Sequence, residues 1–315
     1  MGAFDGERLK KLVGPLRVEP GPRVSLAKDF DPRYSADFLT KEDADEDLSE
    51  GIEVLREYQE RLAAQATDAL LVVLQGIDAA GKDGTIEHVM SGVNPQGVSV
   101  VGFKAPSSQE LRHDFLWRHQ VALPERGRIG IFNRSHYEEV LVVRVHPEFL
   151  AGQHLPPEAV DAGLWERRYR QINDWERHLS ENGIRVAKLF LNVSKEEQRQ
   201  RFVDRIAEPE KGWKFSLADV RERERWDDYQ EAYSRMLSAT STPWAPWQVI
   251  PADKKWFMRL AVAAVIIDAL MAIDPRFPEV DEKMRADMAE AGRLLEAEGE
   301  AEGAGKPQGE GEHPR

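Results

Sequence analysis

The segment LLVVLQGIDAAGKDGT (70–85) limits what this chain can fold into more than any other stretch. It begins with a continuous apolar, β-branched run, which is typical of a strand buried on both faces of a parallel sheet. Two glycines and a lysine then follow the G-x-x-x-x-G-K spacing of a phosphate-binding loop, in which backbone N–H groups and a helix N-terminus bind phosphate oxygens. The residues predicted to bind phosphate are Gly76, Ala79, Ala80, Gly81, Lys82, Asp83, Gly84 and Thr85.

This loop departs from the common pattern beside its lysine. The motif normally continues with Ser or Thr, whose hydroxyl binds magnesium, but Asp83 follows Lys82 here. A second carboxylate, Asp78, lies inside the loop. Lys82 would place a positive charge on a transferred or bridging phosphate. The alternative interpretation is a glycine-rich turn between strand and helix with an exposed lysine.

Short apolar runs alternate with longer helical patterns along the chain. Strands are expected at 70–75, 98–103, 127–137, 184–193 and 247–252. Helices are expected at 49–66, from 81 onward, and at 107–123, 157–182, 194–206, 217–237 and 254–273. Strands that alternate with helices favour a parallel sheet covered on both faces.

The chain ends differ from this central part. Residues 1–48 contain several prolines and an acidic run, which predicts an extended N-terminal arm. The central domain is assigned to 49–275, and 276–315 to an acidic C-terminal helix and a disordered tail.

Composition narrows the possible functions. The formal net charge of −13 provides no general basic field for nucleic acid, so none is expected as a partner. The absence of cysteine excludes disulfides and thiolate metal sites, which suits a cytoplasmic protein. The N-terminus lacks the apolar core of a signal peptide. The longest apolar stretch, 260–273, falls short of the roughly 20 residues that cross a bilayer. We therefore expect a soluble protein without membrane partners.

A second group of polar residues lies in IFNRSHYEEV (131–140), at the end of the third predicted strand. Ligands of open α/β sheets bind outside the carboxyl ends of the strands, so this segment should face the phosphate-binding loop. Arg134 is predicted to clamp a phosphate, and Glu138 and Glu139 to hold magnesium. A surface cluster of ion pairs is the alternative.

A third group combines basic and aromatic residues in 199–226. Arg201 and Arg205 share one face of a predicted helix, and Lys211 and Lys214 lie in the loop that follows it. This pattern is typical of a cationic lid that closes over phosphates. A helical hairpin with a solvated charged face is the alternative.

Together these segments resemble the family-2 polyphosphate kinases, which are P-loop kinases. The resemblance covers roughly residues 20–275. It rests on GIDAAGKDGT (76–85), FKAPS (103–107), HDFLWR (113–118), FNRSHYEE (132–139), KGWKFS (211–216), WDDYQEAY (226–233) and TPWAPWQVIPADKKWF (242–257).

The resemblance implies a fold and an activity. The expected fold is a three-layer α/β/α P-loop kinase with a five-stranded parallel sheet and a helical lid at about 199–240. The expected activity transfers the terminal phosphoryl group between inorganic polyphosphate and a nucleotide, with Mg²⁺, or Mn²⁺, as cofactor. Family members are commonly homodimers or homotetramers. The implied nucleotide-binding residues are Lys104, Arg118, Asn133, Arg134 and Glu138.

At Glu138 the sequence resembles the broad-specificity subgroup, class III, whose members phosphorylate both AMP and ADP. Inorganic polyphosphate, AMP, ADP and ATP are thus the expected partners. Asn133 stands where much of the family carries Asp, so we expect the metal-binding charge to have moved to Glu138 or Glu139. With a bare phosphate chain as donor, Asp78 can replace the missing hydroxyl as a metal ligand. The predicted catalytic residues are Asp78, Lys82, Arg134 and Glu138, and the predicted metal ligands are Asp78, Glu138 and Glu139.

Two other functions stay open on the sequence alone. One is an ATP-dependent nucleotide kinase of the same fold. The other is a non-catalytic phosphate- or nucleotide-binding regulator, for which Asn133 is the only argument. His136 is expected to have a packing or hydrogen-bonding role, because direct transfer needs no phosphohistidine.

Overall fold

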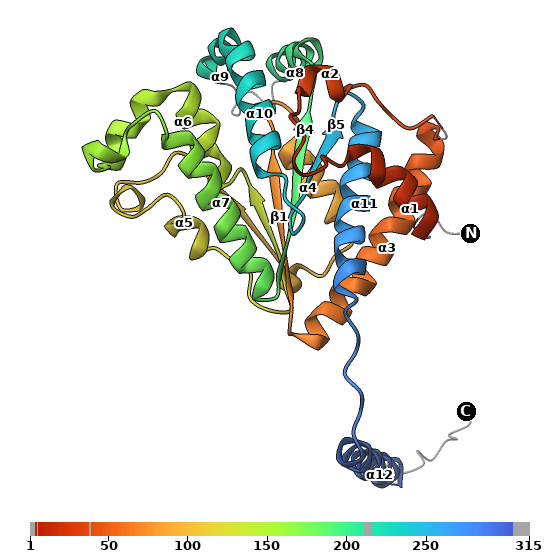
Figure 1. Cartoon of the computed structure of the whole chain (residues 1–315). Coiled ribbons are helices and arrows are strands. Elements are labelled where there is room, and N and C mark those ends of the chain that lie inside the picture. The colour runs from red at the N-terminus through yellow and green to blue at the C-terminus, as the bar shows by residue number, and fades with distance from the viewer. Residues whose placement is uncertain (1–3, 5, 38, 209, 211–215, 305–315) are drawn as a thin grey trace, which may run out of the picture. The chain divides into compact units, whose positions relative to one another are not determined.

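A computed structural model describes residues 4, 6–37, 39–208, 210 and 216–304. Its centre is an all-parallel sheet of five strands in the order β2-β3-β1-β4-β5 (Figure 1). The strands are β1 (Ala69–Gln75), β2 (Val98–Gly102), β3 (Ile129–Asn133), β4 (Ile184–Asn192) and β5 (Trp247–Pro251). Each of the five predicted strands is confirmed. Leu74 pairs with Asn133, so β1 and β3 end side by side.

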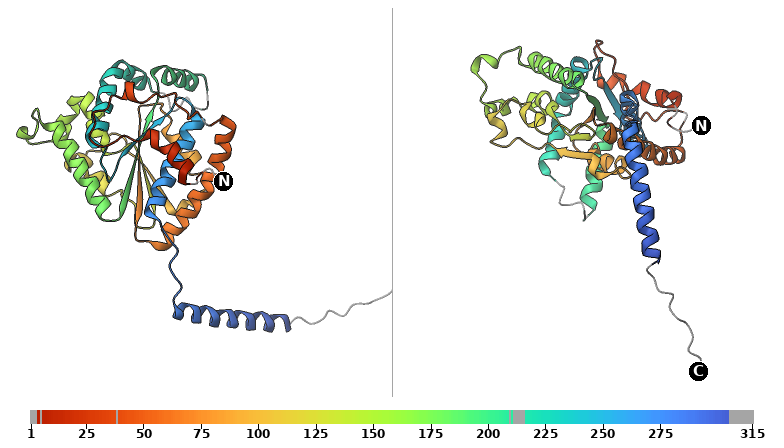
Figure 2. Two further views of the ribbon diagram at one scale, coloured as in Figure 1. Left: turned by 45° about the vertical axis from the view of Figure 1, so that its right-hand side comes forward. Right: turned by 90° about the horizontal axis from the view of Figure 1, so that it is seen from below.

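Helices cover both faces of this sheet, as the views from two further directions also show (Figure 2). The longer ones are α1 (Gly6–Val13), α3 (Lys41–Gln65), α4 (Lys82–Val89), α7 (Leu164–Glu181), α8 (Lys195–Ala207), α10 (Trp226–Thr240) and α11 (Lys255–Ile273). Short helices are α2 (Leu26–Asp29), α5 (Trp117–Gln120), α6 (Val142–Val145) and α9 (Leu217–Arg221). The 3₁₀ helices are η1 (Gly14–Leu16), η2 (Pro95–Gly97), η3 (Glu110–Arg112), η4 (His136–Val140), η5 (Pro147–Gln153), η6 (Pro157–Ala159) and η8 (Glu222–Arg225).

The two faces have separate cores, which confirms the three-layer α/β/α arrangement. On one face, Leu70, Val72 and Leu74 of β1 pack against α3 and α11. On the other, Leu71 and Val73 of the same strand belong to a core with α7 and α10. A strand with both faces covered is apolar throughout, which explains the continuous apolar run of β1. Within the described chain, α11 alone has the length and hydropathy of a membrane span, but 67% of its most apolar window is buried in the protein, as in a core helix.

The predicted helix over 107–123 is wrong. A reciprocal cap of the kind that starts a helix is present, in which Ser107 N donates to Glu110 Oε2 and Glu110 N donates to Ser107 Oγ. Only η3 and the four-residue α5 follow it. Between them Asp114 Oδ1 accepts a hydrogen bond from the Leu116 N–H at 2.9 Å, a local turn that competes with helix formation.

Three boundaries differ from the sequence predictions. The N-terminal arm contains α1, and α3 begins at Lys41 inside the predicted arm. α7 begins at Leu164, after the prolines near 157, and ends as predicted before Gly183, which has φ +80°. The predicted lid included α10, but this helix is part of the core beside α7. A second unit begins at Phe277, and its described part contains α12 (Glu282–Ala304).

Candidate active site

The phosphate-binding loop connects β1 to α4. Gly76 has φ +156° and Gly81 φ +106°, backbone conformations that side chains rarely adopt. A Cβ on Gly76 would also lie 3.0 Å from the Leu191 carbonyl oxygen, so the loop needs glycine there for space as well. Gly81 caps α4, whose first N–H groups therefore point towards the loop.

Lys82 is the first residue of α4 and is 8% exposed. Its ammonium donates to the carbonyl oxygens of Gly76 at 2.6 Å and Ile77 at 3.1 Å. Burial, and then the like charge of Arg134, lower the pKa of Lys82 to about 8, although Asp78 and Glu138 oppose the shift. The charge of this lysine is thus poorly compensated, and an anion in the loop would stabilise it.

Arg134 connects the loop to the end of β3. Its N–H donates to the Leu74 carbonyl, and it has a left-handed φ of +63°. Its guanidinium bonds to Asp78 and lies 3.6 Å from Glu138 Oε2. Burial disfavours its charged form, but Glu138 and Asp78 outweigh that and raise the pKa of Arg134. Three of the four predicted catalytic side chains therefore meet at one point.

The predicted metal ligands separate into two sets. Asp78 and Glu138 flank the Arg134 guanidinium, and their side chains are partly exposed, at 27% and 26%. Glu139 is 7% exposed and is held by Arg168 and by Gln153 Nε2 at 2.9 Å. Magnesium between phosphates needs one or two carboxylates plus water, and the first pair provides them. The described residues contain no cluster of three or more acids or histidines suited to a metal.

Asn133, which replaces the more common Asp, is tied to the loop. Its Nδ2 donates to Asp83 Oδ1 at 2.7 Å. A carboxylate in its place would face the Asp83 carboxylate across the same gap. Asp83, predicted to bind phosphate, therefore also orients the Asn133 side chain.

A cavity of about 1360 Å³ opens over this cluster. It is lined by the loop, the end of β3, η4, η5, α8 and the segment after β2. Lys104 and Arg118, predicted to bind the nucleotide, both lie in its wall, and Arg118 Nη2 donates to the Lys104 carbonyl at 2.8 Å. The Arg118 guanidinium lies 5.0 Å from the centre of the Phe103 ring. One cavity thus contains both the phosphate-binding end and the predicted nucleotide-binding residues.

The predicted lid cations occupy different positions. Arg201 is 8% exposed, and its guanidinium donates to the carbonyls of Ala80 at 2.7 Å and Ala252 at 2.5 Å. Arg205, one turn later, lies in the cavity wall beside the Phe202 ring. Arg201 therefore connects α8 to the phosphate-binding loop, while Arg205 remains the more available cation. Lys211 and Lys214 lie outside the described residues.

Among the predicted loop residues, Gly76, Ala80 and Thr85 do not line the cavity. The Thr85 hydroxyl donates to the Gly81 carbonyl at 2.9 Å, and its side chain is fully buried. This threonine therefore offers the cavity no side chain.

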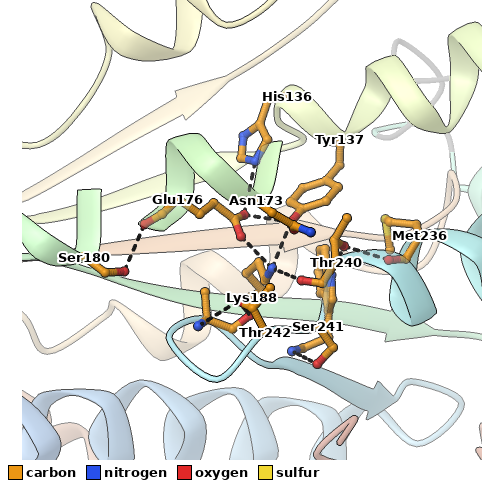
Figure 3. Close-up of polar contacts among 12 residues, drawn as sticks. His136, Tyr137, Asn173, Glu176, Ser180, Lys188, Met236, Thr240, Ser241 and Thr242 are labelled. Atoms are coloured by element: carbon orange, nitrogen blue, oxygen red, sulfur yellow. Dashed lines mark hydrogen bonds and ion pairs between the residues drawn. The ribbon is translucent and has the colours of Figure 1, made fainter. Parts of the chain in front are cut away.

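Sequence reasoning missed the residues that support the site. Gln198 Nε2 donates to the Asp78 carbonyl at 2.9 Å, and Gln75 Nε2 donates to Ser135 Oγ at 3.0 Å. Their signal was weak, because polar side chains are common at strand ends and helix starts. Lys188 gave a clearer signal, since it is a charged residue in the middle of the otherwise apolar run VAKLFL (186–191). It pairs with Glu176 in a buried network that also contains His136, whose Nε2 lies 3.3 Å from Glu176 Oε1 (Figure 3).

The fold and this cluster define a class of protein: a three-layer α/β/α protein with a P-loop at the carboxyl ends of its central strands. A sequence model of polyphosphate kinase 2 (PPK2) matches residues 38–278. The chain belongs to this family.

Relatives and solved structures agree with this assignment. An ADP-polyphosphate phosphotransferase from Rhodopseudomonas palustris is 48% identical, over 89% of this chain and 96% of the relative. An AMP/ADP-polyphosphate phosphotransferase from Meiothermus ruber is 45% identical, over 84% of this chain and 94% of the relative. The crystal structure of polyphosphate kinase 2 from Arthrobacter aurescens superposes with a TM-score of 0.80 at 41% identity, covering 88% of this chain and 95% of that one.

Proposed function

We propose that this protein is a polyphosphate-dependent nucleotide kinase that transfers the terminal phosphoryl group of inorganic polyphosphate to AMP and to ADP, and in reverse. The observation that carries the proposal is the meeting of Asp78, Lys82, Arg134 and Glu138 in one cavity. Family membership supports the donor, and the names of the two relatives above support the acceptors.

The described residues suit a transfer that depends on charge neutralisation. An oxygen of the acceptor phosphate attacks the terminal phosphorus of the chain, and the shortened chain leaves as an anion. Lys82 and Arg134 stabilise the negative charge that spreads over the transferred group. The acceptor phosphate is already largely ionised near neutral pH, so no side chain has to remove a proton. Asp78 and Glu138 would hold Mg²⁺, or Mn²⁺, which neutralises phosphate charge when bound.

The test is a product assay with purified protein, magnesium and one donor–acceptor pair at a time, followed by chromatography. With polyphosphate, AMP should give ADP and then ATP, and ADP should give ATP. Asp78→Asn should lose this activity, while Glu87→Gln, which changes a helix acid that does not line the cavity, should keep it. Activity with ADP but not with AMP would contradict the broad acceptor specificity that is attributed to Glu138. Activity with ATP but not polyphosphate as donor would contradict the proposal.

We further propose a homodimer or homotetramer that works in the cytoplasm. Support for self-association comes from α12, which exposes Met284, Met288, Leu294 and Leu295. Light scattering tests this by measuring the molar mass of the full chain and of residues 1–276, which lack α12. A mass of two or four chains is expected for the full chain, and a monomer at all concentrations would contradict it.

A further inference from the structure

A buried ion pair lies directly under the catalytic segment Asn133–Glu138. Lys188, in the middle of β4, and Glu176, in α7, are each 0% exposed, and Lys188 Nζ lies 2.7 Å from Glu176 Oε2. Figure 3 shows the pair within a group of polar side chains from η4, α7, β4 and α10. This face of the sheet is otherwise filled by apolar side chains. The pair is therefore an exception within the core.

Every hydrogen-bonding group of this pair has a partner. Lys188 Nζ donates to Glu176, to Tyr137 Oη at 2.9 Å and to the Thr240 carbonyl at 2.6 Å, which uses all three donors of an ammonium group. Burial raises the pKa of the Glu176 carboxyl, but the Lys188 ammonium outweighs this and lowers it, so the carboxylate stays ionised. The pair thus has a single fixed geometry.

The catalytic segment is attached to this pair by two consecutive residues. Tyr137 Oη donates to Glu176 Oε1 at 2.7 Å, and His136 Nε2 lies 3.3 Å from the same oxygen. Both residues lie between Arg134 and Glu138 in the sequence, while those two line the cavity.

Stability alone does not explain a pair of this kind. Removing two charges from water is costly, and replacing a buried ion pair with apolar side chains is often neutral or stabilising. The catalytic segment, in contrast, contains a residue that needs support, because the left-handed φ of Arg134 persists only where the surroundings enforce it. His136 and Tyr137, two and three residues after Arg134, join the segment to the ion pair and so provide that support.

We propose that Lys188 and Glu176 are positioning residues, which act through Tyr137 and His136 to hold Arg134 and Glu138 against the phosphate-binding loop. The expected effect on kcat rests on the proposed function. The expected effect on the rigidity of residues 131–141 does not.

The first test compares two substitutions of the same type. Tyr137→Phe removes the hydroxyl that joins the segment to the pair. Tyr169→Phe, the control, removes a hydroxyl from the same core that, among the described residues, bonds to Arg144 alone, at 3.1 Å. We expect Tyr137→Phe to speed hydrogen–deuterium exchange in residues 131–141 and to lower kcat by about 10-fold or more with little change in KM, since small misplacements of reacting groups have large kinetic effects. The control should do neither.

The second test removes the pair without leaving a buried charge. Glu176→Leu combined with Lys188→Met removes both charges but also the partners of the Tyr137 hydroxyl and the Thr240 carbonyl, so the melting temperature should fall. The variant should accelerate exchange in 131–141 beyond the rest of the sheet and lower kcat to a similar extent. If that variant does not fold, Tyr137→Phe decides. Unchanged exchange in both variants would overturn the inference. Unchanged kcat would overturn it equally. If the wild type transfers no phosphoryl group, the proposed function fails, and hydrogen exchange still decides whether the pair holds the segment.

Discussion

Lys82 makes the site sensitive to pH. Its pKa in the free protein is about 8, below the ordinary value of 10.5, because burial disfavours the ammonium. A bound polyanion favours the ammonium and raises this pKa again. Binding of polyphosphate should therefore take up protons between about pH 8 and pH 10, and its affinity should fall as pH rises through that window.

Calorimetry in buffers with different enthalpies of ionisation measures this proton uptake. Lys82→Arg, which stays charged throughout, should bind without uptake. If Lys82→Arg takes up as many protons as the wild type on binding polyphosphate, the uptake belongs to a group other than Lys82. For the free protein, the lowered pKa destabilises the fold while Lys82 is charged, below about pH 8, and this cost disappears as pH rises towards 10.5.

Arg134 is expected to contribute mainly to the transition state. Arg134→Lys keeps a positive charge but loses the planar fork that bridges Asp78 and Glu138. We predict a loss in kcat of about 100-fold or more, with a smaller change in KM. Steady-state kinetics with polyphosphate and ADP measure it. Arg128→Lys, an exposed site outside the cavity, is the control and should leave kcat unchanged.

At the scale of single residues, the sequence located the catalytic group better than its supports. Gly76, Gly81 and Lys82 were recognisable because the motif has fixed spacing, and Arg134 and Glu138 because they follow a strand that ends beside it. The role of Glu139 was not recognisable. Its partners Arg168 and Gln153 lie on separate elements that only the folded chain brings together.

Between elements, α8 stabilises the loop through one side chain. Arg201 donates to carbonyls of the loop and of the segment after β5. Arg201→Met would leave these buried carbonyls without partners. We predict a loss of about 2 kcal/mol or more in the free energy of unfolding. Denaturant unfolding measures it.

Arg205→Met is the matched comparison on the same helix. Arg205 lies in the cavity wall beside Phe202, and its guanidinium is more accessible than that of Arg201. This variant should weaken polyphosphate binding while the free energy of unfolding stays close to that of the wild type. A stability loss in Arg205→Met together with a binding loss in Arg201→Met would contradict the structural role of Arg201 and the binding role of Arg205.

At the scale of elements, the sheet was predictable because its strands are short, mainly apolar runs, and the central strand β1 is apolar and buried along its whole length. The helix over 107–123 was not predictable in this way, because Leu111 and Phe115 have the i, i+4 spacing of a helical face without forming one. In the structure both line the cavity, and the turn at Asp114 separates them. Apolar periodicity cannot distinguish the wall of a cavity from the face of a core helix.

For the whole molecule, the family match ends at residue 278 and the first compact unit at Arg276. All described residues of the proposed site precede that point. A chain of residues 1–276 should therefore keep the kcat of the full protein, as measured with polyphosphate and AMP. A large loss in the shortened chain would place a functional contribution in α12 or beyond.

In the proposed reaction, the phosphoryl group passes directly from polyphosphate to a nucleotide. The most direct measurement uses radiolabelled polyphosphate with unlabelled AMP and magnesium, quenched at short times. We predict label in the β-phosphate of ADP and then in the γ-phosphate of ATP, with none retained on the protein, because His136 is buried against Glu176. Label that stays on the protein before it reaches the nucleotide, or that never reaches it, would contradict the account.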